Sequence, residues 1–587
     1  MVFKQKKCRM TNAAAAFLMT AAVAAAAYKC GGFYYDLNDD VLIKDILSGV
    51  YSGSPDGHTM QILYPLGWLL SLLYYIPGVP VFGLFLCLCQ FGAIYVIAYR
   101  TLQCLDSRGK KILLLLAQGI FWMGACLEHL VFLQYTVTAG MLGAAAVFWI
   151  ATSQKPESFA VFLRENLPAL ILYWIAFCLR SEMGLLLLPL AGITGLCKWF
   201  SHKKPFAKEN LTGYVGLFAA LMAGIVLCLG AEALAYGSDD WQEFSRYFDA
   251  RTTIYDYQRD VVEDYGENKR IYEELGMSQT RQQLLKNYNF SADDSIDADF
   301  LEALAQKSVE RENGGLFKKD LRMGIWELVF GHFLGKADFC LNAGMIFLGL
   351  LLFGTAFFRK QKNGVWQAVL VTGCAAALWL FLILRGRLPV RLTTPLYLTM
   401  TASFGGLLLT AQNAENENDS QKQEGCLQIL TLHAAAVGLV LCGILTAPEN
   451  AGAAIQQVQE RQQTNSVNEA VMAYCSQTPD ILYLADVYST VRFSEKIGVD
   501  RDKPFNYDIM GGWISKSPLT QKKLQDFGLE SVGEAVCGQE NVRLLTDAGT
   551  DFIWLLDFLA EQGIAAEAVL TDKIADGAVE VYQIVCR

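Results

Sequence analysis

Two adjacent carboxylates, Asp39 and Asp40, lie in the polar stretch FYYDLNDDVLIKDILSGVYSGSPDGH, which covers residues 33–58 and follows the first apolar run. A carboxylate pair beside a bilayer could take a proton from a hydroxyl group or could bind a metal ion. The letters NDDVLIKDIL are also typical of a helix start with acidic residues in its first turn. The two interpretations are compatible, because a helix N-terminus also fixes the position of a carboxylate.

Arginines near the ends of apolar runs are the candidates for phosphate binding. Arg180 and Glu182 stand in FCLRSEMGLLLLPL, between two short apolar stretches, where ionisable side chains are costly. Either they pair with one another or reach the interface, or Arg180 holds a lipid phosphate. In LRGRLPVRLTTPLY, Arg385, Arg387 and Arg391 could bind a phosphate by paired hydrogen bonds or could anchor a loop to lipid headgroups. We favour Arg387 and Arg391 over Arg385 as phosphate ligands.

The polar segment 236–330 begins with WQEFSRYFDARTTIYDYQRD, in which aromatic residues alternate with charged ones. An amphipathic helix resting on the membrane surface would show this pattern. An aromatic platform for a sugar or lipid headgroup would show it too, with Arg246 or Arg251 meeting phosphate, and we place Arg251 in the binding site. His58 and His129 could bind phosphate, or bind a metal with the Asp cluster, although a single histidine is more often an ordinary polar residue.

Composition identifies the setting of these residues. The chain has 587 residues, of which 53% are hydrophobic and only 18% charged. Several runs of about 17 to 25 apolar residues are long enough to cross a hydrocarbon core as helices. The formal charge of −10 makes nucleic acid an unexpected partner. None of the sixteen cysteines forms a CxxC pair with metal-ligand spacing. We assign no residue as a metal ligand and leave a divalent cation at the Asp pair open.

The basic start MVFKQKKCRM precedes an Ala-rich run and resembles a signal peptide, but further apolar runs follow and we favour an uncleaved anchor. The positive-inside rule then places the N-terminus in the cytoplasm and the Asp pair outside. The run 60–76 is short and bounded by prolines, so we predict a helix in the outer interface rather than a span. Eleven spans result, at about 11–28, 79–99, 112–127, 132–151, 167–180, 184–200, 211–235, 333–358, 365–384, 392–411 and 427–447.

The predicted fold class is an α-helical polytopic membrane protein with a C-terminal extracytoplasmic α/β domain. Residues 1–447 form the transmembrane module, with a first outer loop at 29–78 and a large outer loop at 236–330, and residues 448–587 form the soluble domain. In that domain helical patterns alternate with strand-like runs, which predicts a sheet covered by helices. The helical patterns are 452–476, 517–527 and 549–562, and the strand-like runs are 481–487, 541–547, 566–572 and 579–585.

The soluble domain contains no GxGxxG, no Walker motif and no nucleophile elbow. We therefore expect it to be a recognition or packing module rather than a second enzyme.

An Asp pair after the first span, followed by an amphipathic stretch and many further spans, resembles the glycosyltransferase C (GT-C) superfamily. The resemblance covers the topology of roughly 1–450, and its one short motif is Asp39–Asp40. It implies a polytopic enzyme that uses polyprenyl-phosphate-linked sugars. It also implies that Asp39 is the catalytic base and that a basic residue such as Arg180 holds the donor phosphate.

The function expected from the sequence is therefore transfer of a sugar from a polyprenyl-phosphate donor to a glycan, lipid or protein acceptor at the outer face of the plasma membrane. The expected catalytic residues are Asp39 and Asp40. The expected substrate-binding residues are Arg180, Glu182, Arg251, Arg387, Arg391 and His58. The alternatives are a cell-surface polysaccharide polymerase or ligase, a transporter of lipid-linked glycans, and a non-catalytic assembly protein that would keep its function after Asp39→Asn.

Overall fold

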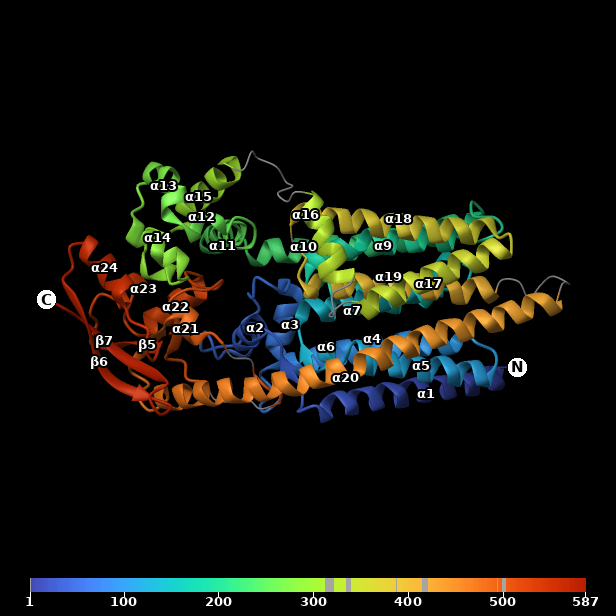
Figure 1. Ribbon diagram of the computed structural model, residues 1–587, viewed down its shortest axis with the longest axis horizontal. Coiled ribbons are helices and arrows are strands. Elements are labelled where there is room, and N and C mark those ends of the chain that lie inside the picture. Colours follow the sequence, from blue (N-terminus) through green and yellow to red (C-terminus); the bar gives the residue numbers. More distant parts are fainter. Residues whose placement is uncertain are drawn as a thin grey trace.

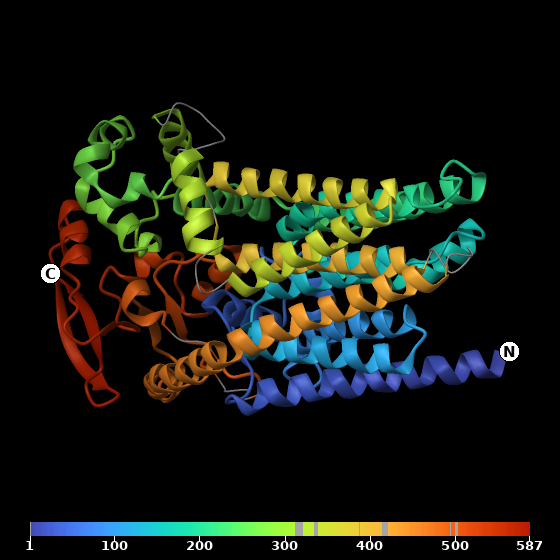
Figure 2. The same ribbon diagram turned by 45° about the vertical axis from the view of Figure 1, so that its right-hand side comes forward.

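The computed structural model describes residues 2–311, 321–333, 339–386, 388–413, 421–492, 495–498 and 503–587. Most of these residues are helical (Figure 1). Long helices run side by side in an elongated bundle, and the N-terminus lies at one end of it. A small sheet and a group of shorter helices lie at the other end, and the turned view in Figure 2 shows the same two parts.

Nine helices in the described part of the chain are long and apolar enough to cross a membrane. The chain is therefore a multi-pass membrane protein by helix length and composition. These helices are α1 (Val2–Lys29), α4 (Val81–Gln103), α8 (Phe159–Leu179), α9 (Ser181–Phe200), α10 (Lys208–Ala235), α17 (Phe339–Phe358), α18 (Lys362–Arg385), α19 (Val390–Asn413) and α20 (Gln421–Cys475).

The other two predicted spans, 112–127 and 132–151, correspond to α5 (Arg108–Ala125) and α7 (Tyr135–Ala151). α5 begins with the basic letters RGKK, so its apolar part is shorter than its 18 residues. α7 has 17 residues, nearly all of them buried, and it packs against α4, α8, α9 and α19. Its neighbours therefore surround α7 at the centre of the bundle.

Small residues allow these helices to approach closely. Gly140 of α7 lies so near Pro395 of α19 that a Cβ atom there would clash with the proline ring. Gly124 of α5 lies equally close to the backbone of Gly443 in α20. Close packing of this kind holds helices together in lipid, where the hydrophobic effect does not.

The longest helix, α20, connects the bundle to the C-terminal domain. The predicted span 427–447 and the predicted helix 452–476 form one continuous helix of 55 residues, with Pro448 inside it. At 1.5 Å per residue this helix is about 80 Å long. It is the orange helix that runs from the bundle to the sheet in Figure 1.

The first polar loop contains two helices, α2 (Asn38–Ser48) and α3 (Tyr64–Leu73). α3 corresponds to the predicted interfacial helix, and its ten residues extend about 15 Å, only half of a hydrocarbon core. Before α2, strand β1 (Tyr34–Tyr35) pairs in parallel with β2 (Phe132–Leu133), which lies directly before α7. This pairing holds the loop against the end of the bundle.

The polar segment after α10 folds into short helices: α11 (Asp239–Tyr257), α12 (Asp260–Glu263), α13 (Tyr265–Glu274), α14 (Gln279–Lys286), the 3-10 turn η1 (Phe290–Ala292), α15 (Ala298–Arg311), α16 (Leu321–Trp326) and the π-helix η2 (Glu327–Phe333). The aromatic stripe of α11 is mostly buried, since Trp241, Phe244 and Tyr247 are each at most 9% exposed. α11 packs on α15 and on the C-terminal domain. Its aromatic pattern therefore serves a protein core.

The C-terminal domain is a five-stranded sheet in the order β4-β3-β5-β7-β6, in which β4, β3 and β5 are parallel and β7 is antiparallel to β5 and β6. The strands are β3 (Leu482–Ala485), β4 (Tyr507–Ile509), β5 (Val542–Asp547), β6 (Ala566–Ile574) and β7 (Val579–Cys586). The helices are α21 (Val487–Thr490), α22 (Pro518–Asp526), α23 (Val532–Ala535) and α24 (Ile553–Glu561). Four strands, α22 and α24 lie where the sequence predicts them, and β4 is an additional strand.

Four buried charges join α2 to the C-terminal domain. Lys44 Nζ lies 2.6 Å from Asp45 and 2.7 Å from Glu495, and Lys503 Nζ lies 2.7 Å from Asp45 and 2.5 Å from Glu495. Each side chain is at most 11% exposed. Burial alone would raise the pKa of Glu495, but Lys503 and Lys44 lower it to about 2. Glu495 is therefore ionised in the folded protein at neutral pH.

We predict that Glu495→Gln lowers the free energy of unfolding by about 3 kcal/mol at neutral pH, because it leaves two buried ammonium groups short of a partner. The folded-state pKa of Glu495, about 2, lies below its ordinary value of 4.5. Its stabilisation is therefore complete above pH 4.5 and is lost as the pH falls towards 2. Unfolding of the purified protein in detergent, followed over a pH series, measures both effects.

Glu567→Gln is the matched control, because Glu567 forms an exposed pair with Arg587. Exposed pairs contribute little, so this variant should unfold like the wild type. Equal stability of the wild type and Glu495→Gln at neutral pH would contradict the prediction.

Candidate functional site

Asp40 connects the start of α2 to α7. It is fully buried, its Oδ2 accepts a hydrogen bond from the backbone N–H of Leu37 at 3.1 Å, and its Oδ1 accepts one from Tyr135 at 3.0 Å. Burial raises the pKa of Asp40 well above its ordinary value, although these two hydrogen bonds act in the opposite direction. Both carboxylate oxygens of Asp40 thus accept backbone hydrogen bonds. The bond from Leu37 lies at the start of α2, as the helix-start interpretation of the Asp pair predicts.

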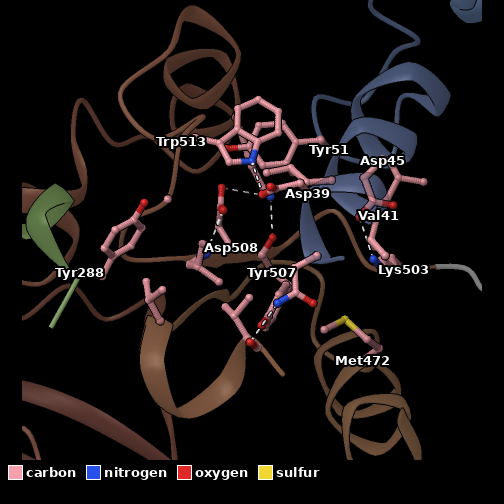
Figure 3. Close-up of a pocket in the computed structure, with 18 of the residues that line it drawn as sticks. Asp39, Val41, Asp45, Tyr51, Tyr288, Met472, Lys503, Tyr507, Asp508 and Trp513 are labelled. Atoms are coloured by element: carbon pink, nitrogen blue, oxygen red, sulfur yellow. Dashed lines mark hydrogen bonds and ion pairs between the residues drawn. The ribbon is translucent and has the colours of Figure 1, made fainter. Parts of the chain in front are cut away.

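Asp39 lies instead in a pocket of about 240 Å³ between α2 and the C-terminal domain (Figure 3). The indole Nε1 of Trp513 donates a hydrogen bond to Asp39 Oδ1 at 3.0 Å. Among the described residues, Asp39 Oδ2 has no hydrogen-bond partner. The carboxylate is half-buried, so this oxygen is available to a ligand. Of the two acids, Asp39 is therefore the one placed to accept a proton.

Arg180 lies at the break between α8 and α9, where its extended backbone (φ −157°) ends one helix and begins the next. Its Nε pairs with the exposed Glu182 at 3.0 Å, as one interpretation of the sequence predicts. The guanidinium also donates to the hydroxyl of Tyr135 at 3.2 Å and to the side-chain oxygen of Gln61. Arg180 therefore joins the helix break to the start of α7.

Tyr135 is the point where several predicted site residues meet. Its hydroxyl donates to Gln61 Oε1 at 3.0 Å, and the Arg180 guanidinium lies 5.4 Å from the centre of its ring. Asp39 and Arg391 lie within electrostatic range of the same hydroxyl. Charges from three separate segments of the chain, Asp39, Arg180 and Arg391, thus act on one hydroxyl group.

Arg251 reaches the pocket from α11. Its guanidinium lies 5.5 Å from the ring centre of Tyr255 and 5.1 Å from that of Tyr288. Burial lowers the pKa of Arg251 from its ordinary value, while Tyr255, Asp256 and Asp39 act in the opposite direction. Its buried Nε has no hydrogen-bond partner among the described residues. Arg251 therefore lines the same pocket as Asp39 and keeps an N–H group for a ligand.

The remaining arginines differ in their surroundings. Arg246 pairs with two exposed carboxylates of α15 at 2.6 Å each, and Arg385 lies 5.0 Å from the ring centre of Tyr257. Arg387 lies outside the described residues. Arg391 is half-buried, and no hydrogen bond or ion pair joins it to another described residue. Of the two described arginines near the junction of α18 and α19, Arg391, in the first turn of α19, is therefore the one without a ring contact, hydrogen bond or ion pair among the described residues.

The histidines lie away from the pocket around Asp39. His58 Nδ1 lies 2.7 Å from Asp56 Oδ1, and the His58 ring stacks on Trp241 at 4.4 Å between centres and against Tyr236. His129 lies beside α19, with Nε2 3.2 Å from a threonine hydroxyl. The contacts of His58 join the first polar loop to α10 and α11.

Within the residues that the structure describes, no group of three or more His, Cys, Asp or Glu side chains could hold a metal ion. Asp39 and Asp40 have different partners, so the pair does not form a joint chelate. Among the described residues there is therefore no cluster of this kind for the divalent cation that the sequence leaves open.

Sequence reasoning missed three uncharged residues of the site, namely Tyr135, Gln61 and Trp513. Trp513 lies 474 positions from Asp39 in the chain, so no local pattern connects them. Gln61 and Tyr135 are polar residues next to apolar runs, and this is the signal that could have drawn attention to them.

Comparison with protein-family models, curated proteins and solved structures finds no match to this chain. The chemistry must therefore be argued from the arrangement of the residues. A half-buried carboxylate with a free oxygen lies among arginines at one end of a membrane bundle. Such a site can take a proton from a hydroxyl group while cationic side chains hold an anionic leaving group.

We predict that the two acids differ in their contribution to stability. Asp40→Asn places an amide NH₂ against a buried backbone N–H and should lower the free energy of unfolding by about 2 kcal/mol. Asp39→Asn keeps an oxygen for the Trp513 indole and should change it by less than about 0.5 kcal/mol. Denaturant unfolding of the two variants in detergent compares them directly. Equal losses in both variants would show that the two acids share one structural role.

Proposed function

We propose that this chain is an integral membrane glycosyltransferase that moves a sugar from a polyprenyl-phosphate donor to a hydroxyl acceptor at the outer face of the plasma membrane. The observation that carries the proposal is Asp39, a carboxylate with one free oxygen, among arginines at the end of the bundle opposite the N-terminus. The basic N-terminal segment supports a cytoplasmic N-terminus and, with it, an outer position for Asp39.

In the proposed reaction Asp39 takes the proton of the acceptor hydroxyl as that oxygen bonds to the anomeric carbon of the donor sugar. The bond between the anomeric carbon and the phosphate oxygen breaks, and its electron pair leaves with the polyprenyl phosphate. Because phosphate is already a stable leaving group, no second protein acid is required. Cationic side chains that stabilise the phosphate as its charge develops would accelerate this step.

The arginines have separate parts in this proposal. Arg180 and Arg391 lie near Tyr135, at the start of a bundle helix, where the headgroup of a lipid-borne donor would arrive. Arg251 lies on the soluble side of Asp39 and lines the pocket. Arg391 is the more informative phosphate ligand to test, because it makes no hydrogen bond or ion pair within the described residues.

We predict that Asp39→Asn lowers the rate of sugar transfer by about 10³-fold, the range expected for loss of a general base. The assay uses radiolabelled polyprenyl-phosphate sugars and membranes that contain the protein. Asp576→Asn, an exposed position in the turn between β6 and β7, is the matched control and should transfer at the wild-type rate. Transfer that is indifferent to Asp39→Asn would remove Asp39 as the base, and no transfer from any carrier sugar would favour a transporter.

We also predict that Arg391→Gln raises the KM for the polyprenyl-phosphate donor about tenfold, the effect of losing one charge-assisted hydrogen bond. The KM for the acceptor should not change. Arg246→Gln removes an arginine whose partners are exposed carboxylates and serves as the control. Initial rates at varied donor concentration measure the effect, and an unchanged donor KM in Arg391→Gln would assign the phosphate to other residues.

A further inference from the structure

The pocket around Asp39 has one wall from the membrane module and one from the C-terminal domain. Helix α2 supplies Asp39, Val41 and Asp45, and the domain supplies Asp508 and Trp513 from the opposite side (Figure 3). A ligand in this space would touch the free oxygen of Asp39 from the side of the soluble domain. The Tyr135 hydroxyl, Gln61 and Arg180 are not among the residues that line it.

The charges in the pocket wall cancel. Three acids and three bases line it, namely Asp39, Asp45, Asp508, Arg251, Lys503 and Lys523. Lys503 is held by Asp45, and Lys523 lies 3.3 Å from Asp508. Arg251 is the one base of this wall without an ion pair among the described residues. A diphosphate would find little free positive charge here, whereas a neutral ligand would need no counter-charge.

The rest of the wall combines apolar side chains with hydrogen-bonding groups. The apolar members include Val41, Val50, Met472, Val491 and Ile509, and the half-buried ring of Tyr288 lies among them. Asp39 offers one free oxygen, and Asp508 Oδ1 accepts from the Ile509 backbone N–H at 2.8 Å, while its carboxyl group has further acceptor sites. A ligand that matches this wall needs C–H groups to pack on the apolar side chains and hydroxyl groups to donate to the carboxylates. A saccharide ring presents both.

We infer that this pocket is the acceptor subsite and that the acceptor is a neutral saccharide, bound between α2 and the C-terminal domain. The inference rests on the proposed function and names its substrate class. One hydroxyl of the bound ring faces Asp39, which removes its proton, and the hydroxyl oxygen attacks the anomeric carbon of a donor held near Arg180 and Arg391. Donor and acceptor then approach Asp39 from opposite sides.

The structure favours a saccharide over the other acceptors that the sequence leaves open. A lipid acceptor would need an apolar path to the bundle, but the soluble domain forms one wall of this pocket. A polypeptide would need an extended groove or a free sheet edge. The edge strand β4 lines this pocket, but its Tyr507 carbonyl accepts from Lys523 and its Ile509 N–H donates to Asp508, and the space is only about 240 Å³. Pockets with apolar walls and a few polar groups are typical small-ligand sites.

Two pocket-filling variants test the inference from opposite walls. Val491→Trp fills the pocket from the C-terminal domain, and Val50→Trp fills it from the loop after α2. Val569→Trp makes the same change on the exposed face of β6 and is the control. Thermal unfolding of the full-length protein in detergent identifies which filling variant folds normally, and that variant is used.

The first readout is binding of methyl hexosides to the full-length protein, followed by saturation-transfer NMR without any donor. We expect binding to the wild type and to Val569→Trp, with at least about tenfold weaker binding to the filling variant. In transfer assays the filling variant should raise the KM for the saccharide acceptor and leave the KM for the donor unchanged. A free oligosaccharide and the same oligosaccharide on a polyprenyl carrier, assayed in parallel, distinguish the source of the acceptor.

The two readouts separate this inference from the proposed function. Sugar transfer with an acceptor KM that the filling variant does not change would overturn the acceptor subsite and leave the glycosyltransferase in place. Hexoside binding that the filling variant abolishes, with no transfer from any polyprenyl-phosphate sugar, would support a saccharide site and overturn the transferase. Equal hexoside binding by the wild type and the filling variant would overturn the saccharide site itself.

Discussion

Lys44 lies between Asp45 and Glu495 in a buried ring of alternating charges, and it is 451 positions from Glu495 in the chain. The ring closes through Lys503 and joins α2 to the C-terminal domain. Buried ion pairs add little net stability, because desolvation offsets their attraction, but their geometry is restrictive. The ring lies along the same helix as Asp39, so it fixes how far Trp513 and Asp508 lie from the candidate base. The pocket lies between the two parts that this contact joins.

A second connection acts together with the charge ring. Helix α20 continues from the bundle into the domain without a loop, and Arg461 on this helix donates to the backbone oxygens of Tyr35 and Asp36 at 2.9 and 3.0 Å. The domain is thus held by a rigid helix on one side and by buried charges on the other. A flexible tether would let the pocket open and close, but these two contacts favour one arrangement of the walls. A pre-organised site of this kind loses less free energy when it orders a ligand.

The sequence predicted features that depend on local patterns and failed where distant residues decide. Apolar run length predicted the long helices, and short strand-like runs predicted four strands of the sheet. β4 was missed because its three half-buried residues, YDI, carry no alternation. The sequence predicted the span 427–447 and the helix 452–476 as separate elements, whereas α20 is continuous through both. The different surroundings of Asp39 and Asp40 could not be predicted, since their partners Trp513 and Tyr135 lie far away in the chain.

The distribution of charge around Asp39 gives a physical reason why, in the proposed reaction, the acceptor and the donor would reach this carboxylate from different sides. A neutral saccharide can leave water for the pocket without the large cost of desolvating an ion. The donor phosphate carries its charge throughout, so it requires cations, and Arg180 and Arg391 lie near Tyr135 rather than in the pocket wall. In the proposed transfer, the proton would move to Asp39 and negative charge would move to the phosphate, towards these arginines. Electrostatic stabilisation is greatest when the cations are already in place where charge develops. Arg251 is the arginine that lines the acceptor pocket, and among the described residues no ion pair joins it to Asp39. An arginine paired tightly with Asp39 on that side would weaken it as a base.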